Sequence, residues 1–351
     1  MWAEIAVSAV KVAVIAGTVL TLVAVMEWVE RRGAAFIQDR LGPNRVGPLG
    51  LFQPIVDAVK LLFKEDLTPA NVNRGLYLLA PMISVSVALL TFIVIPFGAG
   101  KDITVFGVPL GGIEVAPDLG VGVLFLLAIG SLGVYGIVLA GWSSNNKYSL
   151  LGGLRSSAQL ISYELSMTLA VLGVLLATGS LRLDAVVARQ GGQFWLGVIP
   201  QWNVVPQILG CIVFVVAVFA ETNRLPFDLA EAETELVAGY HVEYSSMKFA
   251  AFLMSEYMNM VTASALIVTL FFGGWTFPGM GRFSGWPLLA LSLVAFGIKL
   301  AFFLWLFVWV RWSLPRFRYD QLMRLGWKGL LPLATLNLVW VGVAMAMGWI
   351  R

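Results

Sequence analysis

Long apolar stretches separated by short polar ones dominate the chain. A helix that crosses the hydrocarbon core of a bilayer needs about 20 mostly apolar residues. Eight segments meet or approach this length, and they lie near residues 4–28, 76–97, 120–141, 158–178, 204–221, 248–273, 287–311 and 330–349. Because backbone polar groups inside lipid must bond internally, we expect these segments to be helices. The pattern therefore predicts an all-α membrane protein, with residues 1–351 as one polytopic domain.

The few charged residues orient the predicted helices. Only 12% of the residues are charged and 59% are hydrophobic, about half the charge of a typical soluble domain. Cytoplasmic connections of membrane proteins are rich in Lys and Arg. The first, third, fifth and seventh connections, with their flanking residues, hold 16 of the 23 Lys and Arg residues. We expect both termini in the periplasm and cytoplasmic loops near 29–75, 142–157, 222–247 and 312–329.

Some connections contain patterns of their own. In the first, the Gly and Pro residues of GPNRVGP (42–48) are typical of a rigid turn. Residues 51–66 follow with an apolar face and a face that carries Asp57, Lys60 and Lys64, which predicts an amphipathic helix. Such a helix lies in the membrane interface or caps a cavity, although a plain surface helix fits equally well. On the periplasmic side, 101–116 is typical of a small hairpin and 180–195 of a short helix and turn.

Acidic residues gather near the predicted fifth and sixth helices. Glu164 and Glu256 lie within predicted spans, where a carboxylate is costly unless it faces a cavity or a partner. Glu221 closes the fifth span, and five more acids follow it, at Asp228, Glu231, Glu233, Glu235 and Glu243. The predicted topology brings Glu164, Glu221 and Glu256 to the cytoplasmic half of the membrane. This pattern indicates a hydrated acidic funnel, and the alternative is a set of solvated helix ends with one hydrogen-bonded core acid.

The types of titratable residue point to proton exchange rather than redox chemistry. On a helix, residues 231 and 235 share a face, and like charges that close raise at least one pKa. A solvated acidic loop explains the same residues. His241, the only histidine, is a proton-exchange candidate, or a hydrogen-bonded structural residue. Lys299, near mid-membrane in the seventh span, is a candidate to continue a proton path.

The chain has too few ligands for a redox centre of its own. Cys211 is the only cysteine, whereas an iron–sulfur cluster takes about four. A haem held between two histidines needs one more histidine than the sequence contains. The net charge of +3, without an acidic or basic tail, argues against a nucleic-acid partner. We expect neither a metal nor a bound cofactor in this chain alone.

Three long stretches carry a resemblance to a known family. VERRGAAFIQDRLGPNRVGPLGLFQPIVDAVKLLFKED, AETNRLPFDLAEAETELVAGYHVEYSSMKFAAFLMSEY and WVRWSLPRFRYDQLMRLGWK resemble the H subunit of NADH-quinone oxidoreductase, the quinone-site membrane subunit of respiratory complex I. The resemblance implies eight tilted helices in a bacterial inner membrane and a quinone chamber shared with the hydrophilic arm. FMN and iron–sulfur clusters are then expected in partner subunits, with antiporter-like subunits as further partners.

The resemblance also implies roles for particular residues, matched motif by motif. It implies a proton channel lined by Glu164, Glu221, Glu231, Glu233, Glu235 and Glu256, with Lys299 as a candidate beyond them. It places Arg31, Arg40, Asp57, Arg316 and Arg318 near the quinone path. Two other readings remain, a membrane anchor in a hydrogenase-type complex and a stand-alone secondary transporter that uses the membrane glutamates for coupled cations.

The charge distribution yields a test of orientation. We expect a periplasmic phosphatase fused after Arg351 to be active, because the connections rich in Lys and Arg lie on the other side of the membrane. Enzyme activity in intact cells measures this directly. Fluorescence from a cytoplasmic reporter fused at the same position would contradict the predicted topology.

Overall fold

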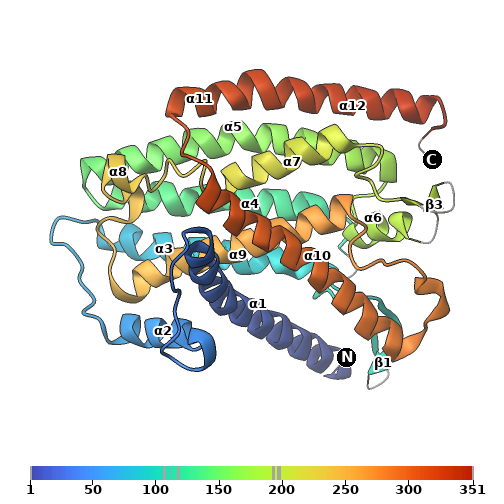
Figure 1. Cartoon of the computed structure of the whole chain (residues 1–351), viewed down its shortest axis with the longest axis horizontal. Helices are drawn as coiled ribbons and strands as arrows, with labels where there is room; N and C mark the ends of the chain where they lie inside the picture. Colours follow the sequence, from blue (N-terminus) through green and yellow to red (C-terminus); the bar gives the residue numbers. More distant parts are fainter. Residues whose placement is uncertain are drawn as a thin grey trace.

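The computed structural model describes residues 2–105, 108–111, 113–116, 119–191, 194–195 and 199–349. Most long helices run side by side, and α1 and α10 cross the others obliquely (Figure 1). The long helices and those that complete the bundle are α1 (Trp2–Ile37), α3 (Arg74–Leu90), α4 (Gly122–Ser143), α5 (Lys147–Thr178), α7 (Ile208–Glu221), α9 (Ser246–Phe271), α10 (Gly285–Ser313), α11 (Tyr319–Arg324) and α12 (Leu331–Ala346). A π-helix (Leu325–Leu330) joins α11 to α12.

Short elements occupy the connections. Helices α2 (Gln53–Phe63), α6 (Leu183–Gln190) and α8 (Glu233–Leu236) are accompanied by 3₁₀ turns at Pro48–Gly50, Thr91–Val94, Gly239–His241 and Met280–Arg282. Strands β1 (Gly100–Val105) and β2 (Val108–Gly111) pair antiparallel, as do β3 (Phe194–Trp195) and β4 (Ile199–Pro200). The structure therefore confirms the predicted hairpin within 101–116 and the short helix within 180–195. Helix α2 is shorter than the predicted 51–66.

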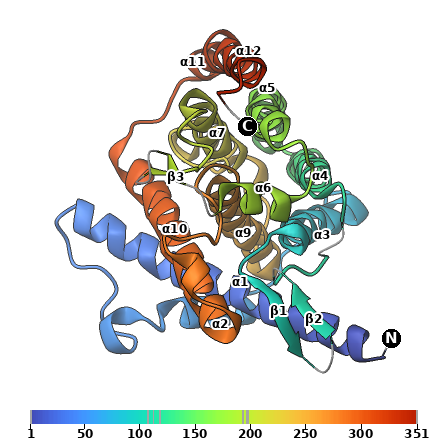
Figure 2. The same ribbon diagram turned by 90° about the vertical axis from the view of Figure 1, so that its right-hand side faces the viewer.

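Five helices enclose the core of the bundle. Seen end-on, α3, α4, α5, α7 and α9 surround it, α12 packs outside α5 and α7, and α1 and α10 lie on the other side of α9 (Figure 2). Helix α9 is central, because 67% of its most apolar stretch is buried against 22% for α1. The largest fully buried apolar side chains include Phe214, Phe271, Met258 and Ile267. The remaining apolar surface of the outer helices is available to lipid.

Helix α5 begins earlier than predicted. The sequence pattern placed a cytoplasmic connection at 142–157, but the structure is helical from Lys147, where the Asn146 side chain accepts a hydrogen bond from the Tyr148 backbone. The Gly and Ser residues that made this stretch look less apolar instead allow close packing. A Cβ atom at Gly152 would lie 2.9 Å from the backbone oxygen of Ala230. The added turns of α5 therefore pack against the acidic segment.

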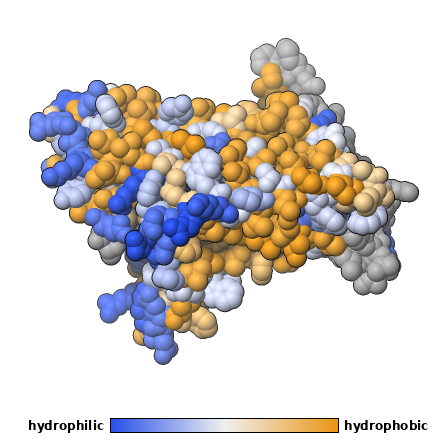
Figure 3. Space-filling model, turned by 90° about the horizontal axis from the view of Figure 1, so that it is seen from above, coloured by the Kyte–Doolittle hydropathy of each residue, from blue (hydrophilic) through white to orange (hydrophobic). Residues whose placement is uncertain are grey.

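Within the described residues, seven helices are long and apolar enough to cross a membrane. The predicted fifth span, 204–221, is the exception, because its helix α7 has only 14 residues. The N-terminal end of α1 and the C-terminal end of α12 nevertheless lie at the same end of the bundle (Figure 1). In Figure 3, hydrophilic side chains gather at the end where α8 lies, and hydrophobic side chains cover the middle of the molecule.

Candidate functional site: buried acids and their cavities

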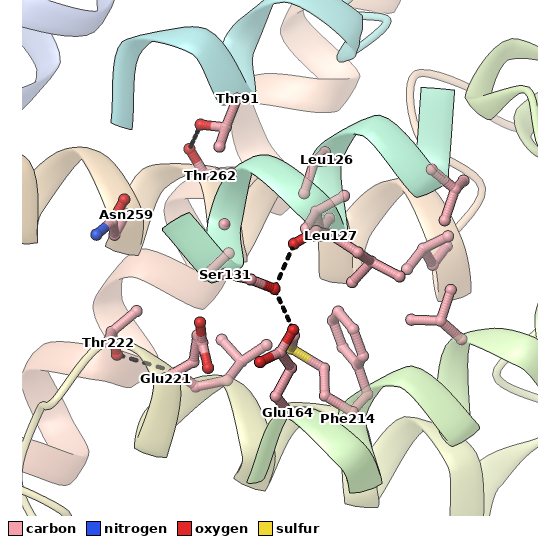
Figure 4. Close-up of a pocket in the computed structure, with 18 of the residues that line it drawn as sticks. Thr91, Leu126, Leu127, Ser131, Glu164, Phe214, Glu221, Thr222, Asn259 and Thr262 are labelled. Atoms are coloured by element: carbon pink, nitrogen blue, oxygen red, sulfur yellow. Dashed lines mark hydrogen bonds between the residues drawn. The ribbon is translucent and has the colours of Figure 1, made fainter. Parts of the chain in front are cut away.

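A cavity inside the helix ring holds two of the predicted acids. It has a volume of about 90 Å³ and is lined at its polar end by Ser131, Glu164, Glu221, Thr222 and Asn259. Glu164 on α5 and Glu221 at the end of α7 both point into it, and the Ser131 hydroxyl donates to Glu164 (Figure 4). A buried water needs roughly 10–15 Å³ of such space. The cavity therefore has room for several waters beside both carboxylates.

A second cavity of about 50 Å³ adjoins the first. Glu231, Glu256 and Tyr240 line it, whereas Gly130, Glu221, Thr222 and Asn259 line both cavities. A Cβ atom added at Gly130 would meet no other atom within 4 Å. The second oxygen of Glu221 is buried and has no hydrogen-bond partner among the described residues. Four of the predicted acids, Glu164, Glu221, Glu231 and Glu256, therefore line two adjoining cavities.

Glu256 also takes part in a buried ionic cluster. The Nε atom of Arg224 lies 2.6 Å from Oε1 of Glu256, and Nη1 of the same guanidinium donates to Glu30 over 2.9 Å. Glu30 accepts further hydrogen bonds from the Tyr257 hydroxyl, at 3.0 Å, and from Arg311. Arg224 is only 3% exposed and Glu30 6%. Two acids thus neutralise the buried Arg224 from either side, and Arg311, whose side chain is 29% exposed, pairs with Glu30 at the edge of the cluster.

The acidic segment after α7 is folded onto the bundle rather than spread in solvent. Its Gly239 has φ +58°, and a Cβ atom there would lie 1.7 Å from the backbone oxygen of Ala230, so only glycine fits. The Tyr77 and Tyr244 rings stack with centroids 4.1 Å apart, and the Tyr77 hydroxyl donates to the backbone oxygen of Glu243. The segment is therefore packed against the bundle at Gly239 and Tyr244.

His241 lies in the same segment, at the end of the 3₁₀ turn Gly239–His241. Its Nδ1 is 3.7 Å from Glu231, and its ring packs edge-on against Tyr240 and Phe249. Burial lowers the pKa of His241 to about 4, so the imidazole is neutral at pH 7. The contact with Glu231 therefore joins a carboxylate to a neutral ring.

Glu233 and Glu235, which alternate with Glu231 along the chain, are placed differently. Glu235 is exposed and forms an ion pair with Arg155 at 2.9 Å, outside both cavities. Glu233 begins α8, and its side chain lies outside the described residues. Of the three, only Glu231 is seen to line a cavity in the described part of the chain.

Lys299 lies at the far end of α9 from the acids. Its ammonium donates to the backbone oxygens of Phe272, Gly274 and Thr276 over 2.7–2.9 Å, and it sits 4.6 Å from the centre of the Trp202 ring. The 16 positions from Glu256 to Phe272 correspond to a rise of about 24 Å along a helix. Lys299 is therefore far from Glu256 and lines neither acid-lined cavity, although the apolar part of the first cavity extends along α9 to Leu270.

Two of the five predicted quinone-side residues, Arg31 and Asp57, meet where α1 contacts α2. Arg31 forms ion pairs with Asp57 on α2 and with Glu27 one turn earlier on α1. The Asp57 side chain is only 14% exposed, and Lys60 lies 3.7 Å away. The Arg31 side chain is 44% exposed, so the acid of this pair is shielded from solvent while its partner is open to it.

A third cavity of about 570 Å³ lies beside this contact. It is bounded by α1, by the turn that follows it and by α10, and Trp28, Arg32, Arg40 and Trp305 are among its lining residues. The Arg32 guanidinium donates to the backbone oxygens of Pro43 and Leu49, which fastens the turn to α1. Ligand pockets commonly measure about 300–1,000 Å³.

The last two predicted residues lie between α10 and α11. Arg316 donates to Asp228 over 2.8 Å and so connects this segment to the stretch after α7. Burial raises the pKa of Asp228, and the Arg316 guanidinium opposes that shift. The Arg318 side chain is 77% exposed and pairs with Asp320.

Sequence reasoning missed Glu30, Arg224 and Arg311 as site residues. Glu30 and Arg224 stand inside the quoted VERR and ETNR stretches, but pattern alone assigned both to predicted cytoplasmic loops, 29–75 and 222–247. The partners of Glu30 lie 194 and 281 residues away along the chain. One available signal was the rule that a charge beside an apolar stretch needs a partner.

The fold and the cavities define a class of protein: a multi-pass helical membrane protein with buried acids inside its bundle. Residues 10–342 match the family model described as NADH dehydrogenase. A protein of Leptospira biflexa, named as the H subunit of NADH-quinone oxidoreductase, is 50% identical over 94% of this chain and 92% of its own length. A protein of Solibacter usitatus, also named as an H subunit of that enzyme, is 47% identical over 97% of each chain. One of Rhodothermus marinus, named as subunit 8, is 50% identical over 95% of each.

The chain therefore belongs to the H-subunit family of NADH-quinone oxidoreductase, respiratory complex I. It is a membrane subunit of that enzyme. The resemblance seen in the sequence is confirmed.

The buried neutral histidine gives a pH prediction. An exposed imidazole has a pKa near 6.5, whereas the pKa of His241 is about 4 in the folded chain. Between about pH 4 and pH 6.5, His241 binds a proton when local unfolding exposes it but stays neutral when the segment is packed. The packed segment therefore loses stability relative to the locally unfolded one as pH falls. Its stability is fully present above about pH 6.5. We expect hydrogen-exchange protection of amides 239–245 to fall by about tenfold or more from pH 7 to pH 5.

The matched variant is His241→Asn, which cannot take up a proton in this range. Its protection should be independent of pH from 5 to 7, whatever its absolute level. Equal pH dependence in both proteins would assign the effect to another group.

Proposed function

We propose that this chain forms a glutamate-lined proton path inside NADH-quinone oxidoreductase and one wall of its quinone chamber. The observation that carries the proposal is the pair of adjoining cavities, one lined by Glu164 and the other by Glu231 and Glu256, with Glu221 in the wall of both. Carboxylates within reach of the same waters can pass protons by hydrogen-bonded exchange. The path would run from Glu231 and Glu256 through Glu221 to Glu164.

Glu233 and Glu235 would lie at the entrance of this path. Glu235 is open to solvent, where it can raise the local concentration of protons without being the only route. Lys299 would act outside the path, because three backbone oxygens and an aromatic ring already surround its charge.

The chain would cross the membrane eight times. Helix α7 is short for a span, at about 21 Å for 14 residues. It packs between α5, α9 and α12, and irregular backbone is tolerated at membrane depth where protein surrounds it. An even number of spans agrees with the outer ends of α1 and α12 lying together (Figure 1). With the orientation that the charge distribution predicts, that end would lie in the periplasm, and α2, α8 and the acids would lie toward the cytoplasm.

The quinone would approach between α1, α2 and α10. The third cavity has the size of a ligand pocket and combines apolar rings with the cation of Arg40. The Arg31–Asp57 contact joins α1 to α2 beside it, and the exposed apolar side chains of α2, including Ile55, Leu62 and Phe63, suit the membrane interface. Arg316 and Arg318 would complete the rim.

Electron transfer would take place in partners. The hydrophilic arm would supply FMN, the iron–sulfur clusters and the rest of the chamber. Antiporter-like subunits would respond to proton movement along the acid-lined path. The whole assembly would lie in the bacterial inner membrane. The relatives described above carry the name of this oxidoreductase rather than that of a hydrogenase or a transporter.

Glu221 is the most direct test of the acid path. In Glu221→Gln the side chain keeps its volume but cannot carry a transferable proton. We expect the coupled proton pumping of the assembled complex to fall by roughly tenfold or more, in line with loss of a positioned proton-transfer group. Pumping is measured as NADH-driven acidification of inverted membrane vesicles. Glu235→Gln should lose less, because its carboxylate is exposed and lies outside both cavities.

Glu65→Gln is the matched control, because Glu65 is exposed on the connection between α2 and α3. It should pump like the wild type. Normal pumping in a Glu221→Gln, Glu235→Gln double variant would show that these acids are only solvated.

Asp57 tests the quinone side. Asp57→Asn removes the charge that faces Arg31, so we expect a rate with a short-chain quinone that is lower by roughly tenfold, in the range of a lost charged contact that is partly buried. NADH oxidation by ferricyanide should stay normal, because that acceptor takes electrons before the membrane. Equal loss with both acceptors would indicate defective assembly, and normal quinone rates would make Asp57 an ordinary surface acid.

A further inference from the structure

The Glu30 carboxylate is the common point of three parts of the chain. It belongs to α1, and it accepts hydrogen bonds from Arg224 in the segment after α7, from Tyr257 on α9 and from Arg311 on α10. It is 6% exposed. One carboxylate therefore joins elements that do not follow one another in the sequence.

Arg224 is shared between two acids. Its Nη1 donates a hydrogen bond to Glu30 over 2.9 Å, and its Nε lies 2.6 Å from Glu256 in an ion pair without hydrogen-bond geometry. The guanidinium lies 4.5 Å from the centre of the Tyr257 ring. A guanidinium presents its donors in a fixed planar fork. If the contact with Glu30 were lost, the fork would be free to turn, and the position of the charge beside Glu256 would change.

Neighbouring residues of α1 face the two proposed functional regions. Arg31 contacts Asp57 on α2 beside the proposed quinone chamber, and Glu30 contacts Arg224, which contacts Glu256 in the second cavity. An unbroken series of ion pairs and one peptide unit therefore runs from α2 to the acid-lined cavities. A contiguous physical connection of this kind can carry coupling between distant sites.

We infer that Glu30 is a positioning residue that holds Arg224 against Glu256 and so links the quinone side of the subunit to its proton path. The inference rests on the proposed function. Glu30 itself lines none of the three cavities described above, so it acts through Arg224 and carries no proton in the path.

Two substitutions separate the effect of the Glu30 charge from the effect of the size of its side chain. Glu30→Gln keeps the volume and removes the charge, whereas Glu30→Asp keeps the charge on a shorter side chain. Positioning by charge predicts a loss of roughly tenfold or more in NADH-driven pumping for Glu30→Gln and a smaller loss for Glu30→Asp. A role in packing alone predicts the reverse order, because Gln fills the site as Glu does.

A third variant uses the charge balance of the cluster. Glu30→Gln leaves Glu256 as the only acid of the cluster, in contact with Arg224, and removes the acid that Arg311 contacts. Adding Arg311→Gln restores one arginine to one acid, so the double variant should pump about threefold or more faster than Glu30→Gln, as expected for residues in direct contact. Because the double variant has no excess buried charge, it keeps the comparison possible if Glu30→Gln assembles poorly.

The assays use membrane vesicles that contain the whole complex, with ferricyanide reduction to normalise for assembly and Glu65→Gln as the exposed control. Pumping in Glu30→Gln equal to the wild type, or Glu30→Asp slower than Glu30→Gln, would overturn the inference. If Glu221→Gln slows pumping while Glu30→Gln does not, only the role of Glu30 fails. If neither variant slows pumping, the proton path itself fails.

Discussion

The arginine at position 224 imposes the main constraint on this structure. Its charge is buried in the interior of a membrane protein, where an ion without a counter-charge is very costly. Glu30 and Glu256 neutralise it, and Arg311 compensates the extra acid. These contacts fix α1, α9, α10 and the segment after α7 at one point. Breaking a buried pair of this kind typically costs about 3–5 kcal/mol, so the arrangement of four elements depends on it.

The cavities follow from this arrangement. Once Arg224 is anchored, the segment that follows it folds back over the end of the helix ring, and Gly239 and Gly152 let it approach α5 closely. The acids of the segment are then split, with Glu231 directed to a cavity and Glu235 to solvent. Glu221 occupies the wall between two cavities because α7 ends there. The same backbone path thus places one set of carboxylates beside enclosed space and leaves another exposed.

Lys299 and Glu221 show two ways in which a membrane bundle accommodates polar groups. Lys299 obtains three backbone oxygens from the turn at the end of α9 and the face of Trp202, which satisfies the three donors of an ammonium. Glu221 has one buried oxygen without a partner among the described residues and faces space large enough for water. The first group is a fixed part of the structure, and the second is suited to exchange.

The sequence by itself determined the helical membrane class, most of the spans, the hairpin and the family, because these depend on local composition and on ordered motifs. It misjudged the start of α5, because Gly and Ser residues that serve close packing resemble those of a loop. It also could not tell Glu231 from Glu235, or find Glu30 as the partner of Arg224. Those distinctions depend on which side chains meet across 194 residues or more, and on which are shielded from water. Only the packing of the helices decides that, since the cost of a charge is set by its surroundings and not by its neighbours in sequence.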